Sequence, residues 1–302
     1  MKNDLYKYTF SVIGGDQRQL ELIRLIYERG GKVKVFGFSK DEFSSMQCSS
    51  GTIEIFNKLN DRLFDSQIIL LPIPYKNKTG HLPTKDLSLH IPLKDVLDHV
   101  KPESRIFLGK KDLEFAELVR GRAIHAIDIM DIEEFTVWNA VPSAEGAIQR
   151  AMEHSNITLH GSRCLVLGYG RIGKVLAQML RGIGAQVTVE ARKPSDLTWI
   201  EVNGFFAVHL HDLSSVLPNQ DFIFNTIPHL VLDEQKLQLV NRNTLIIDLA
   251  SSPGGVDFRV AQSYGIRARH ELGLPGLVAP KTAAKYILDT VLSVLASDKV
   301  KI

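Results

Sequence analysis

Short apolar, β-branched runs alternate regularly with helix-length amphipathic segments along this chain. Such alternation is typical of parallel α/β structures, in which each strand is followed by a helix that crosses over to the next strand. At roughly 100–200 residues per domain, a chain of 302 residues is expected to form two domains. Each half also begins in the same way, with a strand, a glycine-rich turn and a helix.

In the first half, Asp16 is the expected N-cap of a helix that continues to Glu28 with apolar residues at helical spacing. Gly14 and Gly15 lie between that helix and the strand before it. The segment 75–92 is rich in Lys, Pro, Thr and His, and it is expected to form a loop. Strands are expected at 9–13, 32–36, 68–71 and 105–108.

In the second half, Ser143 is expected to cap a helix that ends near Asn156. An amphipathic helix is expected over 281–296, and a terminal helix of this kind often packs back on the first domain. We therefore expect a discontinuous first domain, 1–140 with 276–302, and a second domain, 141–275, between its two parts. Strands of the second domain are expected at 163–167, 186–189, 205–208, 221–225, 244–248 and 266–268.

Composition excludes several classes of protein. Lys and Arg total 36 against 34 Asp and Glu, a net charge of +2, whereas nucleic-acid-binding domains usually carry a marked basic excess. Cys48 and Cys164 are too few and too far apart for a disulfide framework or a cysteine zinc site, which fits a reducing cytosol. His209 and His211 alternate without an assignable third metal ligand. No apolar run approaches the ~18–20 residues that span a bilayer. We therefore expect a soluble cytoplasmic protein without a metal, a membrane segment or a nucleic-acid partner.

A glycine motif follows the strand expected at 163–167 and opens the next helix. Its first glycine permits the tight turn, its second lets the backbone approach a pyrophosphate, and its third lets helix and strand pack closely. Free N–H groups and the positive end of the helix dipole then face the phosphates. We therefore expect a dinucleotide site in a Rossmann-like, doubly wound domain. The six residues of this G-x-G-x-x-G motif are Gly168, Tyr169, Gly170, Arg171, Ile172 and Gly173.

The end of the following strand distinguishes NAD from NADP. An acidic side chain there hydrogen-bonds the 2′-hydroxyl of NAD, whereas a nearby arginine accommodates the 2′-phosphate of NADP. Glu190 lies near the NAD position, but Arg192, Lys193 and Ser195 follow just beyond the strand, where a phosphate would lie. We expect NADP rather than NAD. In the alternative interpretation, Arg192 and Lys193 are solvated and Glu190 is their ion-pair partner.

Two loops follow the strands expected at 221–225 and 244–248. Ligands of such sheets bind at the carboxyl ends of the strands, so both loops are expected to flank the ribose and the nicotinamide. In the alternative, Pro228 and Pro253 only shape tight turns. The residues expected at the cofactor are Asn225, Thr226, Ile227, Pro228, Ala250 and Ser251.

The first half has no second G-x-G-x-x-G motif, so no second dinucleotide is expected there. We expect two Rossmann-like domains with a substrate cleft between them. Arg18, at the start of a helix, suits a carboxylate, and Lys281 and Thr282, at another helix start, suit a second anionic group. Ser143 is also predicted at the substrate. Plainer interpretations remain: Arg18 as a surface charge, Asp16 as a cap only, and Lys281 and Thr282 as helix-start residues.

Six segments taken together resemble the family of the dipicolinate synthase A subunit, and the resemblance covers nearly the whole chain. It implies an enzyme that acts with a flavoprotein-like B subunit to make pyridine-2,6-dicarboxylate from the dihydrodipicolinate branch of lysine biosynthesis. It also implies an NADP-type cofactor, a small dicarboxylate substrate and expression in the mother cell of a sporulating bacterium. A homo-oligomer is expected as well. The segments are VIGGDQRQL at 12–20, VPSAEG at 141–146, VLGYGRIG at 166–173, NTIP at 225–228, DLASSPGGVDF at 248–258 and GLPGLVAPKT at 273–282.

The resemblance assigns no catalytic acid or base, and the chain lacks the Arg–Glu–His pattern of the D-2-hydroxyacid dehydrogenases. Loss of a hydride and a proton makes a dihydropyridine aromatic, so positioning against the nicotinamide can supply most of the catalysis. Glu145 and Asp16 are the candidate proton acceptors, although Glu145 also suits a first-turn charge that favours the helix dipole. Two alternatives stay open. One is a shikimate-dehydrogenase-like or hydroxyacid dehydrogenase, and the other is a non-catalytic nucleotide-binding subunit that activates the B subunit.

Overall fold

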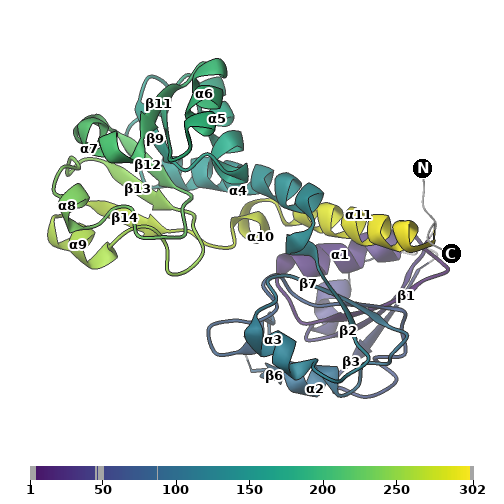
Figure 1. The fold of residues 1–302 in the computed structure, drawn as a ribbon. Helices are drawn as coiled ribbons and strands as arrows, with labels where there is room; N and C mark the ends of the chain where they lie inside the picture. The colour runs from purple at the N-terminus through teal and green to yellow at the C-terminus, as the bar shows by residue number, and fades with distance from the viewer. Residues whose placement is uncertain (1–4, 45, 47–50, 87, 300–302) are drawn as a thin grey trace. The chain divides into compact units, whose positions relative to one another are not determined.

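The computed structural model describes residues 5–44, 46, 51–86 and 88–299. The chain forms two compact units, the first of Met1–Thr136 with Pro280–Ile302 and the second of Val137–Ala279. Each unit contains a six-stranded parallel sheet with helices around it (Figure 1). This arrangement confirms the predicted doubly wound α/β class. No helix of the described residues has both the length and the apolar character needed to cross a membrane.

The sheet of the first unit has the strand order β3-β2-β1-β4-β7-β8. The chain steps from β1 outward to β2 and β3, and then returns to build the other side, so the order reverses between β1 and β4. A small antiparallel pair, β5 and β6, stands apart. The strands are β1 (Thr9–Ile13), β2 (Lys32–Phe36), β3 (Thr52–Phe56), β4 (Ile68–Leu70), β5 (His81–Leu82), β6 (Ile91–Pro92), β7 (Arg105–Leu108) and β8 (His125–Asp128).

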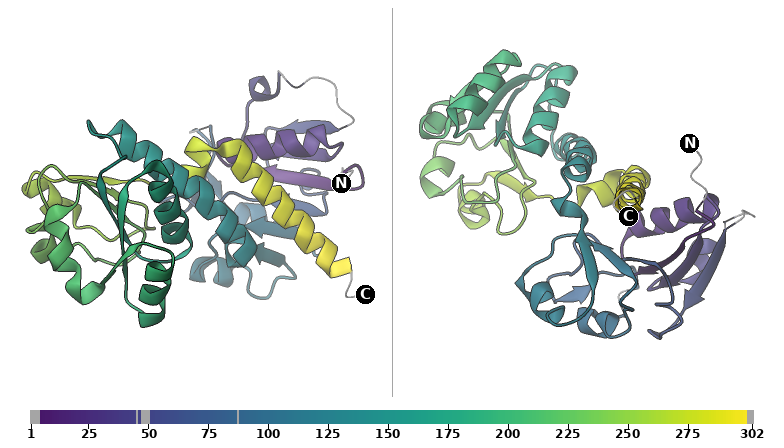
Figure 2. Two further views of the ribbon diagram at one scale, coloured as in Figure 1. Left: turned by 90° about the horizontal axis from the view of Figure 1, so that it is seen from above. Right: turned by 45° about the vertical axis from the view of Figure 1, so that its right-hand side comes forward.

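The long helices α1 (Gln17–Glu28) and α11 (Pro280–Lys299) pack together in the first unit (Figure 2). Ile23 of α1 and Val291 of α11 belong to one buried apolar cluster. Asp16 caps α1 as predicted: its carboxylate accepts the N–H of Arg18, and Gln19 closes a capping box. The shorter helices of this unit are η1 (Lys40–Phe43), α2 (Leu93–Leu97), α3 (Leu113–Leu118) and η2 (Ile129–Asp131).

The sheet of the second unit has the order β11-β10-β9-β12-β13-β14, which reverses between β9 and β12. The strands are β9 (Arg163–Leu167), β10 (Gln186–Ala191), β11 (Phe206–His209), β12 (Phe222–Asn225), β13 (Leu245–Asp248) and β14 (Arg267–His270). The helices are α5 (Arg171–Ile183), α6 (Pro194–Val202), η3 (Leu210–Asp212), α7 (Leu213–Val216), η4 (Leu217–Asn219), α8 (Glu234–Leu237), α9 (Phe258–Ser263) and α10 (Leu274–Val278).

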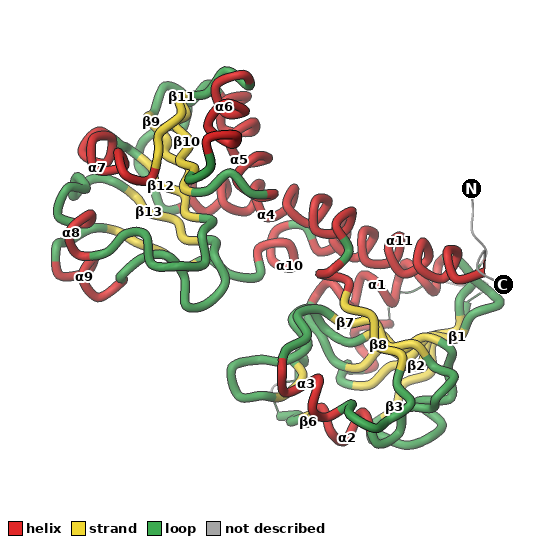
Figure 3. The backbone as a smooth tube through the Cα atoms, in the orientation of Figure 1, coloured by secondary structure: helices red, strands yellow, loops and turns green. Residues whose placement is uncertain are grey.

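The central strand β9 is buried on both faces, as a doubly wound sheet requires. Cys164 and Val166 point into one apolar cluster, and Leu165 and Leu167 point into another on the opposite face. Helices therefore lie on both sides of the strands (Figure 3). This packing holds the carboxyl end of β9, and the turn that follows it, in a fixed position.

The helix predicted to begin at Ser143 begins ten residues earlier, so that prediction is wrong. The helix is α4 (Glu133–Glu153), with Pro142 in its interior. The Ser143 hydroxyl donates to the carbonyl of Asn139 at 2.8 Å instead of capping a first turn. Proline removes one hydrogen bond of the helix and its ring crowds the preceding turn, at a cost of about 3 kcal/mol, but a stripe of buried alanines continues through it at helical spacing. The buried alanines are Ala140, Ala144, Ala147 and Ala151.

Candidate functional site

The glycine motif forms the turn between β9 and α5, where the strand order of the second unit reverses. A Cβ on Gly168 would lie 2.7 Å from Thr226 Oγ1, and one on Gly173 would lie 2.0 Å from the carbonyl oxygen of Gly168. A Cβ on Gly170 would have no heavy atom of the described residues within 4 Å. The protein's own packing therefore requires Gly168 and Gly173 but leaves the space above Gly170 open to a ligand.

The first turn of α5 is suited to a phosphate. Gly170 is its N-cap and has no side chain that could cap this turn, so the positive end of the helix dipole carries no capping carboxylate or hydroxyl from that residue. Tyr169 is half-buried, and the Lys174 ammonium lies 5.2 Å from the centre of its ring. Arg171 is exposed and Ile172 is half-buried.

Glu190 lies beneath the glycine turn and is completely buried. Its Oε2 accepts the N–H of Gly168 at 3.1 Å, and its Oε1 is buried without a hydrogen-bond partner among the described residues. Burial raises the pKa of this carboxyl group, because the charged form is poorly solvated there. No ion pair joins Glu190 to Arg192 or Lys193 in the described part of the chain, and both cations, like Ser195, are exposed around the start of α6.

The loops after β12 and β13 are joined by a buried polar pair. Asn225 Nδ2 donates to Asp248 Oδ1 at 2.8 Å and to the carbonyl of Ile227 at 3.0 Å. Asp248 also accepts the N–H groups of Ala250 at 3.0 Å and Gly255 at 2.8 Å. These bonds occupy the Asn225 side chain, so it fixes the shape of both loops from below.

The remaining residues of these two loops differ in exposure. Thr226 Oγ1 donates to the carbonyl of Leu167 at 2.8 Å, which ties the loop to the end of β9. Ile227 and Ser251 are half-buried and Pro228 is exposed, so these residues form the accessible part of the edge.

The glycine turn of the first unit is covered by its own chain. Gly15 N–H donates to the carbonyl of Pro83 at 2.6 Å, and a Cβ on Gly14 would lie 2.5 Å from the same oxygen. This segment fills the place that a pyrophosphate would need.

Arg18 crosses the point where the strand order of the first unit reverses. It is nine-tenths buried, holds the Asp16 carboxylate through Nε at 3.0 Å and Nη2 at 2.7 Å, and donates from Nη2 to the carbonyl of Ile73. The described residues provide no partner for its Nη1.

The other predicted substrate and catalytic residues lie on helices. Glu145 is exposed in the middle of α4, so its interpretation as a first-turn charge is wrong; it forms no hydrogen bond or ion pair with the described residues. Lys281 and Thr282 are exposed in the first turn of α11, at the helix start that the sequence predicted. Asp16, Arg18, Lys281 and Thr282 belong to the first unit, and Ser143 and Glu145 belong to the second with the cofactor candidates.

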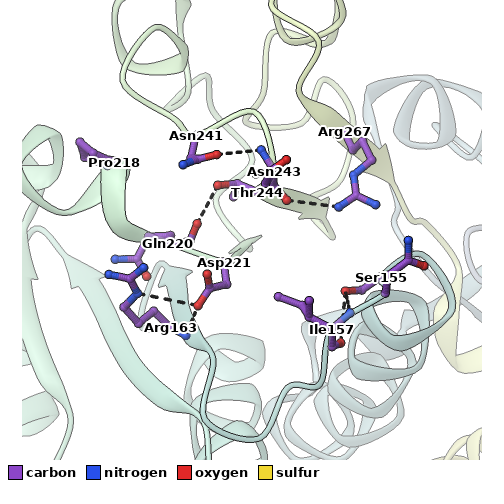
Figure 4. A pocket seen from close by; sticks show the side chains of 11 residues that line it. Ser155, Ile157, Arg163, Pro218, Gln220, Asp221, Asn241, Asn243, Thr244 and Arg267 are labelled. Atoms are coloured by element: carbon purple, nitrogen blue, oxygen red, sulfur yellow. Dashed lines mark hydrogen bonds and ion pairs between the residues drawn. The ribbon is translucent and has the colours of Figure 1, made fainter.

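A cavity of about 390 Å³ lies at the opposite edge of the second sheet, at the amino ends of β9, β12, β13 and β14 (Figure 4). Its lining residues bond to one another: Asp221 accepts the N–H of Arg163 at 2.7 Å, and Arg267 donates to the carbonyl of Asn243 at 3.2 Å. Ligands of open parallel sheets bind at the carboxyl edge. We therefore place the candidate cofactor site at the glycine turn and not in this cavity.

His209 was not among the site residues predicted from the sequence. Its Nε2 lies 3.1 Å from the carbonyl oxygen of Arg192, and its ring centre lies 4.8 Å from that of His211. One feature of the sequence could have indicated this contact: His209 lies at the end of β11, the strand beside β10. Within the described residues, no group of three or more His, Cys, Asp or Glu side chains is arranged to hold a metal ion.

Comparisons with known proteins agree with this division of the chain. Residues 9–130 match the family model of the N-terminal domain of the dipicolinate synthase A subunit, and residues 136–253 match that of the NAD binding domain of D-isomer specific 2-hydroxyacid dehydrogenases. The dipicolinate synthase A subunit of Bacillus subtilis (strain 168) is 34% identical over 290 residues, 95% of each chain.

Solved structures resemble the whole chain. The crystal structure of the dipicolinate synthase A subunit from Bacillus halodurans matches with a TM-score of 0.86 and 32% identity, over 97% of this chain and 99% of that one. An L-alanine dehydrogenase matches with a TM-score of 0.62 over 94% and 88% of the two chains. At 13% identity, that second match supports the Rossmann-like fold alone.

Proposed function

This chain belongs to the family of the dipicolinate synthase A subunit, and from that premise we propose that it is the NADP-dependent oxidoreductase subunit of the synthase. With a flavoprotein-like B subunit, it converts dihydrodipicolinate, or its hydroxylated tetrahydro precursor, to dipicolinate in the mother cell of a sporulating bacterium. The open position above Gly170, between two tightly packed glycines, is the observation that carries the proposal.

The carboxyl edge of the second unit fits such a dinucleotide. Gly170 and the uncapped first turn of α5 hold the pyrophosphate. Arg192, with Lys193 and Ser195 beside it, holds the 2′-phosphate. Glu190 supports NADP over NAD, because its carboxyl group is buried under the glycine turn and bonded to Gly168, away from the surface where a 2′-hydroxyl would meet it. When bound, the nicotinamide supplies the acceptor for a hydride.

Arg18, Lys281 and Thr282 hold the two carboxylates of the substrate. Arg18 retains one guanidinium nitrogen for this purpose, since its other bonds go to Asp16 and the main chain. Ser143 can contribute only as an acceptor, because its hydroxyl hydrogen is directed to the carbonyl of Asn139.

A proton acceptor completes the reaction. Aromatisation of the dihydropyridine ring would release a proton together with the hydride, and a side chain of this protein would have to accept that proton. Glu145 is better suited to this role than Asp16, because Glu145 is exposed and without an ion pair among the described residues, whereas Arg18 holds the Asp16 carboxylate.

A single-turnover experiment tests the proposal. The chain is mixed with NADP and dihydrodipicolinate, first alone and then with the B subunit, and the absorbance of NADPH is followed. NADPH formation in either mixture supports the proposal, and its absence from both refutes it. A Lys281→Ala variant should raise the KM for the substrate and leave the Kd for NADPH unchanged; an unchanged KM would remove Lys281 from the site.

The family match of residues 136–253 favours one second candidate, a hydroxyacid or shikimate-type dehydrogenase that acts without a partner. The same assay separates the two. This candidate forms NADPH from a hydroxy acid with the chain alone. A non-catalytic nucleotide-binding subunit would bind NADPH but form none in any mixture.

A further inference from the structure

We infer that His209 is a positioning residue for the 2′-phosphate of NADP, because it fixes the main chain at Arg192 and sets nucleotide preference through that arginine. The inference rests on the NADP preference proposed above. It assigns a role to a histidine that would not itself touch the nucleotide.

The sheet register brings His209 to the specificity loop. His209 is the last residue of β11 and pairs with Ala191, the last residue of β10, immediately before Arg192. Its imidazole is half-buried between two main-chain groups. Nδ1 lies 3.3 Å from the amide nitrogen of His211, and Nε2 lies 3.1 Å from the carbonyl oxygen of Arg192.

These two partners determine the tautomer of the ring. A main-chain N–H only donates and a carbonyl only accepts, so Nδ1 must accept from His211 and Nε2 must carry the hydrogen that it donates to Arg192. Both ring nitrogens are then committed, one to the start of η3 and the other to the turn that enters α6. No ring nitrogen is left for a ligand, so any effect of His209 on the nucleotide passes through the loop.

Arg192 depends on such support. It is exposed, and its guanidinium has no ion pair or hydrogen bond among the described residues that would hold it in place. Lys193, the N-cap of α6, also makes no side-chain capping bond with the residues that the structure describes. The fixed part of this loop is therefore its main chain, and the bond from His209 determines where the long Arg192 side chain begins. A guanidinium that starts in the right place loses less conformational entropy when it binds a phosphate.

Two conservative variants separate positioning from simple support of the fold. His209→Asn retains an oxygen near the Nδ1 position, which can accept the His211 N–H, but it is too short to reach the Arg192 carbonyl. His209→Gln carries an amide nitrogen near the Nε2 position and restores that donor. The full chain is titrated with NADPH and with NADH, and nucleotide fluorescence gives each Kd.

We expect His209→Asn to raise the Kd for NADPH about three- to tenfold, the value of one hydrogen bond. The Kd for NADH should change less than about twofold, and His209→Gln should return the Kd for NADPH toward that of the unaltered chain. The inference would be overturned if His209→Asn weakened the binding of both nucleotides equally. It would also be overturned if His209→Gln did not restore the binding of NADPH.

Arg192→Ala distinguishes failure of the inference from failure of the proposed function. If Arg192→Ala weakens the binding of NADPH and of NADH equally, the proposed 2′-phosphate site is wrong. If Arg192→Ala is selective for NADPH but His209→Asn has no effect, only the inference about His209 is wrong. The double variant should bind NADPH as weakly as Arg192→Ala alone, because the two residues act in series. Additive losses would refute a route through Arg192.

Discussion

Replacing Gly170 by alanine tests whether this glycine is required for stability of the fold or for binding of the nucleotide. In the part of the chain that the structure describes, the added Cβ meets no heavy atom within 4 Å, and the backbone φ of −81° is one that alanine adopts readily. Alanine is a poorer N-cap than glycine by about 0.5–1 kcal/mol, but it lowers the entropy of the unfolded chain by an amount worth about 0.4–1 kcal/mol. The two effects nearly cancel. We expect the free energy of unfolding to change by less than about 0.5 kcal/mol.

The same methyl group lies where the backbone must approach the pyrophosphate. We therefore expect Gly170→Ala to raise the Kd for NADPH at least about tenfold, or about 1.4 kcal/mol. Fluorescence titration measures the Kd, and urea unfolding of the same sample measures stability.

Two other glycines provide matched controls on the same element. Gly182, near the end of α5, also has open space around a Cβ, so Gly182→Ala should bind NADPH normally and gain about 0.5–1 kcal/mol of stability. Gly173→Ala places its Cβ 2.0 Å from a carbonyl oxygen and should lose stability outright. Unchanged NADPH binding by Gly170→Ala would refute the placement of the pyrophosphate. A stability loss in Gly170→Ala as large as that in Gly173→Ala would refute the steric argument.

Three further predictions concern buried and paired groups. Asp248→Ala leaves one N–H of the buried Asn225 amide and two main-chain N–H groups without their acceptor, and should cost about 3 kcal/mol in urea unfolding. A cost below about 1 kcal/mol would contradict this. Burial would raise the pKa of Asp112, but hydrogen bonds from Lys76 and Tyr75 outweigh it and lower the pKa to about 2. Its stabilising effect is therefore present above the ordinary pKa of 3.8 and is lost as the pH falls toward 2, so Asp112→Asn should flatten the pH dependence of thermal unfolding in that range. Burial raises the pKa of the Cys164 thiol to about 12, so alkylation at about pH 8 should modify its peptide in urea but not in the native chain.

The sequence correctly predicted those structural features that depend on interactions between residues close together in the chain. The cap of α1 is formed by Asp16 and Gln19, three residues apart, and the glycine motif lies within one turn. The helix start predicted at Ser143 is wrong for the opposite reason, because contacts distant in sequence override the local signal there. Pro142 is a strong local sign of a helix start, but the buried alanine stripe on both sides of it is a tertiary feature, and packing of that stripe carries α4 through the proline.

The edge strands of the first sheet and the contacts between strands were not predicted from the sequence pattern. β3 and β8 form the two edges of the first sheet, where partly exposed residues interrupt any continuous apolar run, and neither strand was predicted. His209 shows the same limit for the site. Two alternating histidines resemble an incomplete metal site in sequence, and only the register of β10 with β11 brings one of them to Arg192.

The two units share a topology, yet their glycine turns differ in what they offer an anion. In the second unit the N-cap of α5 is Gly170, which places no side-chain oxygen at the positive end of the helix dipole, so this helix start favours a phosphate. In the first unit the Asp16 carboxylate already caps α1, and the carbonyl of Pro83 lies against Gly14 and Gly15. A phosphate there would meet a carboxylate and a carbonyl oxygen together. Moving the segment around Pro83 alone would therefore not create a second dinucleotide site, because the acidic cap would still repel the phosphate.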